Sequence, residues 1–245
     1  DLGFSVLEVF ENKFPNRYIN VGIAEQNMAS VAAGLALEGN MVFTYSIGNF
    51  PTLRCIEQIR NNICYHNANV KILAVGGGFA YGTLGMTHHA TEDIAIMRAL
   101  PNMNVFVPCD YVSAEMIADE ICEIPLPCYV RMERGGEKKI FDENASLDIY
   151  SIQCIRRGSK IALVVIGTLV NEAIIVAEKL NLSLYVVLTV KPINKRQLED
   201  IADNYDHIIT IEEHNTIGGL GSVICESLSD KKHRAVINCM GLNDE

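Results

Sequence analysis

Short apolar runs of strand length alternate with amphipathic stretches along this chain, and this alternation constrains the fold more than any other feature. The sequence predicts strands at 18–21, 41–45, 70–75, 104–107, 127–131, 161–166, 183–188 and 207–211. It predicts helices at 3–14, 24–38, 52–66, 90–99, 111–122, 170–180, 195–203 and 219–228. Strands that alternate with helices form mostly parallel sheets that carry helices on both faces. The expected fold class is therefore α/β.

A polar stretch divides the chain into two parts. Between about 135 and 158 the residues are rich in glycine and charge, and no helical or strand periodicity is visible. We therefore expect a first domain over residues 1–136, a linker over 137–157 and a second domain over 158–245, each domain built on a mostly parallel sheet. The first domain begins on a predicted helix, whereas doubly wound domains normally begin on a strand, so its start is expected to be truncated.

Charge and cysteine usage exclude several classes of protein. The net charge is −10, and the scattered Lys/Arg pairs build no basic surface for nucleic acid. None of the eight cysteines stands in a C-x-x-C pair, so no zinc ribbon or thioredoxin motif is present. No apolar run reaches the roughly 18 residues that span a bilayer, and no signal peptide is visible. We therefore expect a cytoplasmic protein that binds neither nucleic acid nor membrane.

Glu25 is the candidate catalytic residue. It lies in the segment G-I-A-E-Q-N-M, at the start of the helix predicted at 24–38, among small and apolar neighbours. From its position alone, a glutamate in a first helical turn most often complements the helix dipole. The segment, however, resembles that of transketolases and of 1-deoxyxylulose-5-phosphate synthase. There the glutamate hydrogen-bonds N1′ of the aminopyrimidine of thiamine diphosphate, so the resemblance implies a cofactor-binding and catalytic Glu25.

The resemblance covers nearly the whole chain, and it also implies an aromatic residue that stacks on the aminopyrimidine. Family members have this ring soon after the position that Tyr45 matches. Here Gly48 stands at that place, and Phe50 follows two residues later. The resemblance thus assigns the stacking ring to Phe50, and the alternative is an ordinary core phenylalanine.

Two adjacent histidines are candidate substrate-binding residues. The segment G-M-T-H-H, which ends at His89, resembles the family's G-x-T-H-Q. In the family the first histidine faces the reacting carbons, so the resemblance implies that His88 contacts substrate and transfers protons in catalysis. An imidazole suits that role because it titrates near neutral pH. His89 is expected to be a second substrate contact.

An arginine near the end of the first domain is a candidate phosphate ligand. The segment R-M-E-R-G resembles R-Y-P-R-G of the synthase, whose second arginine holds the sugar phosphate. The resemblance implies that role for Arg134, and a guanidinium suits it because its planar fork can donate two hydrogen bonds to phosphate. The alternative is an arginine at a strand end that pairs with an acidic residue.

Two positions depart from the transketolase pattern. Gly76, the first residue of a triple glycine, stands where transketolases have a phosphate-binding histidine, and Leu84 stands where they have an aspartate that contacts sugar hydroxyls. Neither residue offers a polar side chain for those contacts. We therefore expect substrates other than the standard pentose phosphates.

The second domain resembles the C-terminal domain of the same family. The similarity lies in I-G-T at 166–168, V-K-P-I at 190–193 and E-E-H-N followed by G-G-L-G-S at 212–222. A glycine loop that precedes a helix can hold an anion. We interpret this one as a structural turn.

The sequence lacks G-D-G, the motif with which family members bind magnesium and the cofactor's diphosphate. The resemblance therefore implies the pyrimidine-binding half of a split transketolase, with no metal ligand of its own. Thiamine diphosphate and Mg²⁺ would be held with an N-terminal, diphosphate-binding subunit, in a heterotetramer built on a dimer of this chain. The expected reaction transfers a two-carbon ketol unit between sugars. Two alternatives stay open: the beta subunit of a 2-oxoacid dehydrogenase's decarboxylating component, and a non-catalytic regulatory partner.

Overall fold

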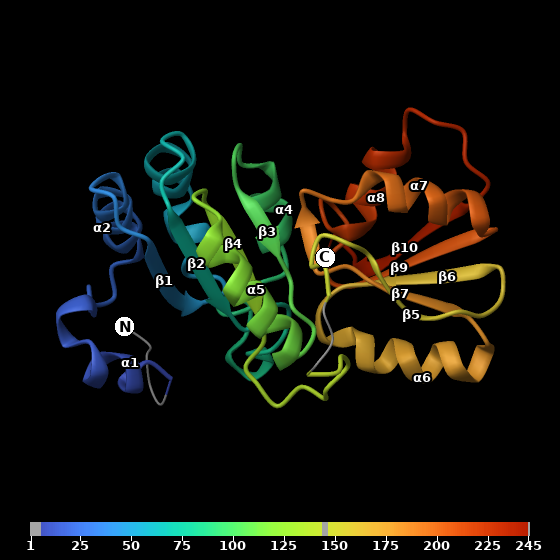
Figure 1. Ribbon diagram of the computed structural model, residues 1–245, viewed down its shortest axis with the longest axis horizontal. Coiled ribbons are helices and arrows are strands. Elements are labelled where there is room, and N and C mark those ends of the chain that lie inside the picture. Colours follow the sequence, from blue (N-terminus) through green and yellow to red (C-terminus); the bar gives the residue numbers. More distant parts are fainter. Residues whose placement is uncertain (1–5, 144–146, 245) are drawn as a thin grey trace.

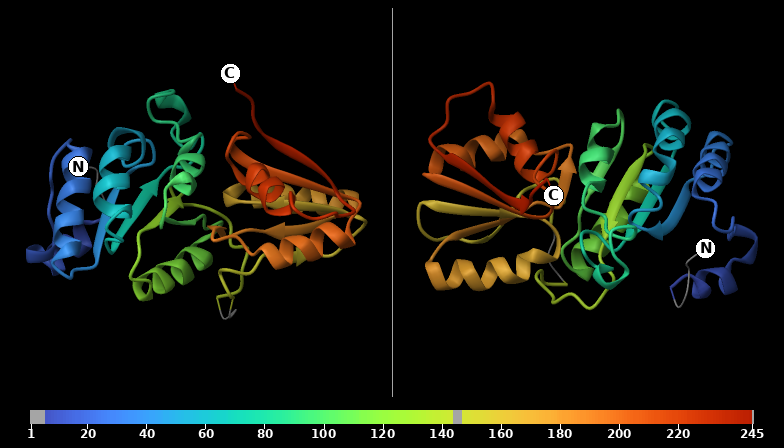
Figure 2. Two further views of the ribbon diagram at one scale, coloured as in Figure 1. Left: turned by 90° about the horizontal axis from the view of Figure 1, so that it is seen from above. Right: turned by 180° about the vertical axis from the view of Figure 1, so that it is seen from behind.

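A computed structural model describes residues 6–143 and 147–244, and this part of the chain forms two five-stranded sheets that lie side by side (Figures 1 and 2). The first sheet has the order β1 (Val42–Ile47), β2 (Val70–Val75), β4 (Cys128–Met132), β3 (Asn104–Phe106) and β8 (Thr189–Lys191). The second has the order β10 (Val236–Leu242), β9 (His207–Asn215), β6 (Ile161–Val165), β7 (Ser183–Val186) and β5 (Gln153–Arg156). All neighbours are parallel except β3 with β8 and β5 with β7.

Helices cover both faces of the sheets, which confirms the predicted fold class. They are α1 (Glu8–Lys13), α2 (Glu25–Leu37), α3 (Ile56–Gln58), α4 (Asp93–Ala99), α5 (Tyr111–Glu123), α6 (Val170–Leu180), α7 (Lys195–Asn204) and α8 (Leu220–Leu228). Figure 1 shows α6 on one face of the second sheet and α7 and α8 on the other. Shorter helical segments are η1 (Pro15–Arg17), η2 (Leu53–Cys55), η3 (Ile59–Cys64), η4 (Gly82–Leu84) and η5 (Gly167–Leu169). Within the described ranges, no helix combines the length and the apolar character needed to cross a bilayer.

Two hydrophobic cores lie on opposite faces of the sheets. Successive side chains of a strand point to opposite faces, and in β6 Val164 belongs to one core and Val165 to the other. Helices α2 and α7 pack into the first core, and α5 and α6 into the second. Each core contains residues of both sheets, such as Ile72 with Val164 and Val130 with Val165. The two domains therefore share their buried apolar surface.

Two predicted elements differ from the structure, and strands β5, β8 and β10 were not predicted. Residues 18–21 run extended without a strand partner in the described part of the chain, so the strand predicted there is wrong. The helix predicted at 52–66 is a 3₁₀ turn (η2), a short α3 and a π-helical segment (η3). Strand β8 leaves the second domain to pair with β3 of the first sheet. The boundaries at 136 and 158 stay a prediction.

Candidate functional site

Glu25 is the first residue of α2, and its carboxylate is buried. Only 7% of its side chain is exposed. Before the helix, Gly22 has a φ of 72°, a conformation that glycine adopts at little cost, and its N–H donates to Oδ1 of Asn20 (2.9 Å). The buried carboxylate has a charged partner, because Nη1 of Arg54 lies 3.1 Å from Oε1 of Glu25.

Phe50 lies on the turn that follows β1, and its ring is buried. The guanidinium of Arg54 sits over this ring, 4.0 Å from its centroid. A side chain at Gly48 is excluded, because a Cβ there would lie 2.9 Å from Cβ of Ala90. An aromatic ring on this turn therefore has to come from another position, and Phe50 supplies it beside Arg54.

The two histidines point to different neighbours. The ring of His88 lies 5.2 Å from that of Phe50, and its Nδ1 lies 3.0 Å from Oγ1 of Thr87. The ring of His89 instead packs against Phe79 at 4.8 Å. The structure thus brings Glu25, Phe50 and His88 together and turns His89 away from them.

Arg134 lies on the other side of this region, over Tyr81. Its guanidinium is 4.7 Å from the Tyr81 ring centroid and donates to the carbonyl of Ala80 (3.2 Å). The Tyr81 ring also neighbours that of His88 at 6.4 Å. Arg134 lines a cavity of about 490 Å³ together with Glu133 and other residues of the same loop. Tyr81 therefore connects the candidate phosphate ligand with the candidate proton-transfer residue.

The triple glycine allows three side chains to approach the backbone closely. A Cβ would lie 2.1 Å from the Tyr81 ring at Gly76 and 2.3 Å from Nε of Arg131 at Gly77. The Tyr81 ring consequently fills the space next to position 76. Sequence reasoning missed both Tyr81 and Arg54. For Tyr81 the signal is the triple glycine, which leaves space for a large neighbouring side chain. For Arg54 the signal is its position in the sequence, four residues after Phe50.

Burial changes the proton affinity of Glu133, which lines the same cavity. Desolvation raises the pKa of this carboxyl from 4.5 to about 7. The charge of Arg131 opposes the rise, whereas the carboxylates of Glu213 and Glu137 add to it. Glu133 therefore changes its charge near neutral pH, close to Arg134.

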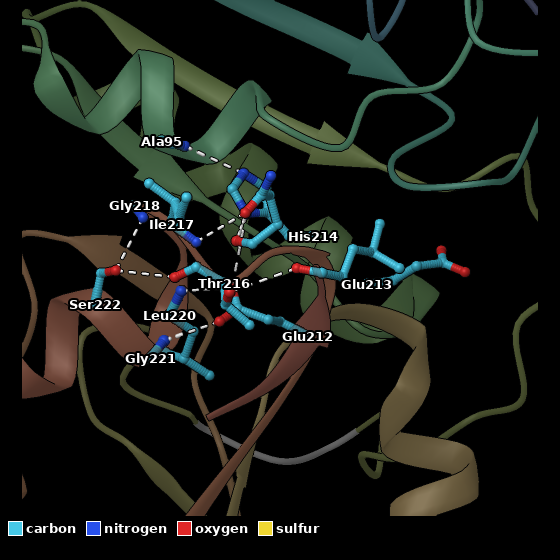
Figure 3. Close-up of polar contacts among 12 residues, drawn as sticks. Ala95, Glu212, Glu213, His214, Thr216, Ile217, Gly218, Leu220, Gly221 and Ser222 are labelled. Carbon is cyan, nitrogen blue, oxygen red and sulfur yellow. Dashed lines mark hydrogen bonds and ion pairs between the residues drawn. The ribbon is translucent and has the colours of Figure 1, made fainter. Parts of the chain in front are cut away.

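The glycine loop of the second domain holds a carboxylate of the chain itself (Figure 3). Glu212 accepts hydrogen bonds from the N–H groups of Leu220 (2.6 Å) and Gly221 (2.9 Å) at the N-terminus of α8. A Cβ at Gly219 would lie 2.0 Å from Oε2 of Glu212, so only glycine fits there. The helix terminus is thus satisfied internally, which supports the structural interpretation of this loop.

Buried polar contacts join the two domains next to the site. His214 of β9 accepts a hydrogen bond at Nε2 from the N–H of Ala95 in α4 (3.3 Å; Figure 3). Burial lowers the pKa of His214, in keeping with a neutral ring whose Nε2 accepts. Arg131 forms an ion pair with Asp93 (3.2 Å) and donates to the carbonyl of Glu213 (2.8 Å). The loop after β4 is therefore anchored to the second domain.

Within residues 6–143 and 147–244, no group of three or more His, Cys, Asp or Glu side chains could hold a metal ion.

Comparisons with known proteins identify both domains. Residues 3–136 match the family model "Transketolase, pyrimidine binding domain", and residues 151–245 match "Transketolase, C-terminal domain". An apulose-4-phosphate transketolase subunit of Phocaeicola vulgatus is 33% identical over 254 residues, which cover 99% of this chain and 79% of that protein. The "6-deoxy-6-sulfo-D-fructose transketolase subunit SqwH" of Clostridium sp. (strain MSTE9) is 32% identical over 231 residues, or 92% of this chain and 72% of that one.

A solved structure shows the same relationship. It is a split-gene transketolase described as an inactive beta4 tetramer, and it superposes with a TM-score of 0.89 at 36% identity, covering 100% of this chain and 81% of that chain. The chain therefore belongs to the transketolase family, in the form of the C-terminal subunits of its split members.

Proposed function

We propose that this chain holds the aminopyrimidine of thiamine diphosphate and, with a diphosphate-binding partner, transfers a two-carbon ketol unit between sugars. The observation that carries this proposal is the arrangement around Arg54. Its flat, cationic guanidinium is a hydrogen-bond partner of the buried Glu25 carboxylate (3.1 Å) and stacks on the Phe50 ring (4.0 Å). An aminopyrimidine is also flat, and its ring nitrogen N1′ can share a proton with a carboxyl group, so Glu25 and Phe50 fit it.

Each residue of the site has a separate role in the proposed reaction. When bound, thiamine diphosphate supplies the carbon that takes up the two-carbon unit. Glu25 shares a proton with N1′ of the pyrimidine, and Phe50 stacks on the ring. His88 moves protons at the hydroxyl of the sugar, since an imidazole accepts and releases protons near neutral pH. Arg134 binds the anionic group of the sugar.

The chain requires a partner to retain the cofactor. Stacking contributes about 0.5–1.5 kcal/mol and a charge-assisted hydrogen bond about 1.5–3 kcal/mol. Association costs about 4–15 kcal/mol, so these contacts alone do not hold the cofactor. We propose that a second protein with the G-D-G motif binds the diphosphate through Mg²⁺, in a heterotetramer of two copies of each chain. The relative described as an inactive beta4 tetramer supports this need for a different second chain.

The substrate is proposed to be an anionic sugar other than the standard pentose phosphates. The ring of Tyr81 takes the space beside Gly76, and Leu84 is 54% exposed where transketolases place an aspartate. Relatives named for apulose 4-phosphate and 6-deoxy-6-sulfo-D-fructose support a range of sugars for such proteins.

We also propose a cytoplasmic location. All eight cysteines are free thiols, and four of them are buried. Free thiols are the expected state in a reducing compartment.

The test is reconstitution with the G-D-G-containing protein that co-purifies with this chain. We expect the complex to bind thiamine diphosphate in a magnesium-dependent manner by calorimetry and the isolated chain not to bind it. In the complex, Glu25→Gln should lower ketol transfer by at least about 100-fold, because the amide cannot share the proton. A screen of donor and acceptor sugars supplies the substrates.

Glu57→Gln is the matched control. Glu57 is exposed in α3, so the same change of charge there should leave ketol transfer within about twofold. A Glu25→Gln complex with half the wild-type activity would show that Glu25 is not the catalytic acid. Tight, magnesium-dependent binding by the isolated chain would refute the need for a partner.

A further inference from the structure

Arg54 makes two contacts that belong to the proposed cofactor ring. Its Nη1 lies 3.1 Å from Oε1 of Glu25, whose side chain is only 7% exposed. Its Cζ lies 4.0 Å from the centroid of the buried Phe50 ring. The Arg54 side chain as a whole is 47% exposed. The guanidinium therefore contacts a buried carboxylate and a buried ring, although its side chain is only about half buried.

We propose that Arg54 is a removable plug: in the free chain its guanidinium occupies the place of the aminopyrimidine, and it has to swing out before that ring can bind. This inference rests on the proposed function of Glu25 and Phe50. A guanidinium and an aminopyrimidine share the necessary chemistry, because both are flat, stack on aromatic faces and hydrogen-bond a carboxyl group, the pyrimidine through the proton that N1′ shares with it. The Oε1 atom of Glu25 and the face of Phe50 that Arg54 covers cannot serve both at once.

The plug also protects the free chain. Without Arg54, the buried carboxylate of Glu25 would lose the cation that lies 3.1 Å from it, and burial of a charge without a partner costs free energy. With Arg54 in place, the site stays ordered until the ring arrives. Because the arginine is half exposed, it can move to solvent without opening the core, and its charge then regains hydration.

If the pyrimidine has to displace Arg54, removal of the arginine should raise the affinity of the chain for the pyrimidine. A partly exposed ion pair and an exposed cation–π contact each shift an equilibrium by roughly twofold to fivefold. A ligand that displaces both contacts binds less tightly by the product of the two factors. Arg54→Met, which keeps the length of the side chain but removes its charge and its donors, should therefore tighten binding of the cofactor's pyrimidine by roughly fourfold to twenty-five-fold.

The first measurement is the NMR spectrum of the Arg54 side chain in the isolated, isotope-labelled chain. Arg54→Lys assigns its Nε–Hε resonance by removing it. We expect a ring-current shift that disappears in Phe50→Leu, whereas Arg60, an exposed arginine that bonds Asn61, should not respond. An Arg54 Nε–Hε resonance that lies at the position of exposed arginines and does not shift in Phe50→Leu would overturn the proposal. This readout does not depend on the activity of the enzyme.

The second measurement titrates thiamine diphosphate, with Mg²⁺, into the reconstituted complex that contains the same labelled chain. We expect the Arg54 resonance to move to the position of an exposed arginine, and Arg54→Met to bind more tightly than the wild type. Arg60→Met is the matched control and should bind like the wild type. Thermal unfolding of each variant checks that it is folded.

The outcomes separate the two proposals. Weaker binding to Arg54→Met would show that Arg54 helps to hold the ring, which overturns the plug but keeps the pyrimidine site. If neither the wild type nor Arg54→Met binds the ligand, the pyrimidine site itself is refuted and the plug with it. Tighter binding together with a displaced Arg54 resonance would establish both.

Discussion

Replacing Glu133 by glutamine should change how the stability of the protein depends on pH. Glu133 is partly buried, and desolvation raises its pKa from 4.5 to about 7 in the folded protein. Between these two pH values the folded state binds more protons than the unfolded state. The free energy of unfolding therefore falls as pH rises through this window. Glutamine resembles the protonated acid and stays neutral, so the variant should lose no stability from this position.

The magnitude follows from the pKa. One pH unit of difference corresponds to about 1.4 kcal/mol, so a rise from 4.5 to about 7 gives roughly 3 kcal/mol as an upper limit. Residual solvent contact reduces it, and the opposing charge of Arg131 is already contained in the pKa of about 7. We expect Glu133→Gln to match the wild type near pH 4.5 and to be more stable by about 1–3 kcal/mol at pH 8.

Urea denaturation of both proteins at several pH values between 4.5 and 8 measures this difference. The difference between the two curves matters, since Glu212 and His214 have pKa values shifted by burial and contribute to both proteins equally. A difference that stays constant over the whole range would refute the raised pKa of Glu133. A wild type that gains stability relative to the variant as pH rises would show that the pKa is lowered instead.

The remaining predictions concern a buried ion pair and close packing at a glycine. Arg131→Met should destabilise the chain by about 3–5 kcal/mol, because it leaves the buried charge of Asp93 without its ion partner; a loss below 1 kcal/mol in urea denaturation would contradict this. Gly48→Ala should cost about 1–3 kcal/mol, because a Cβ there would lie 2.9 Å from Cβ of Ala90. Gly34→Ala in α2 is its control and should stabilise the chain by about 0.5–1 kcal/mol in the same assay, because nothing lies within 4 Å of the added Cβ. Equal effects at both glycines would contradict the close contact at Gly48.

Periodicity predicts the strands that are buried on both faces. β6 is a continuous apolar run, and β2, β4 and β7 each contain a single charged or polar residue in an otherwise apolar run, as expected of central parallel strands. The strands that periodicity missed are short or lie at an edge: β5 and β10 end the second sheet, and β8 has three residues. Their pairing depends on distant segments of the chain, which a local pattern does not encode.

Motif resemblance likewise predicts candidate site residues but does not predict the side chains that contact them. Glu25 and Phe50 were assigned from a resemblance, and the structure brings them to the same guanidinium. Arg54 itself was not predicted, because a cation on a predicted amphipathic helix normally lies on the solvated face. Tyr81 was missed for a similar reason, since only the fold places its ring against the backbone at Gly76.

The sheet order explains why residues so far apart in the sequence converge. Strands β1, β2 and β4 are parallel neighbours, and the segments that follow them carry Phe50, His88 and Arg134 respectively. Ligands of open parallel sheets bind beyond the carboxyl ends of the strands. The last strand, β4, also carries Arg131, which donates to the carbonyl of Glu213 in the second domain. The second domain therefore holds the end of β4, just before the loop with Arg134, and a change at this domain interface should alter the position of Arg134 more than that of Glu25.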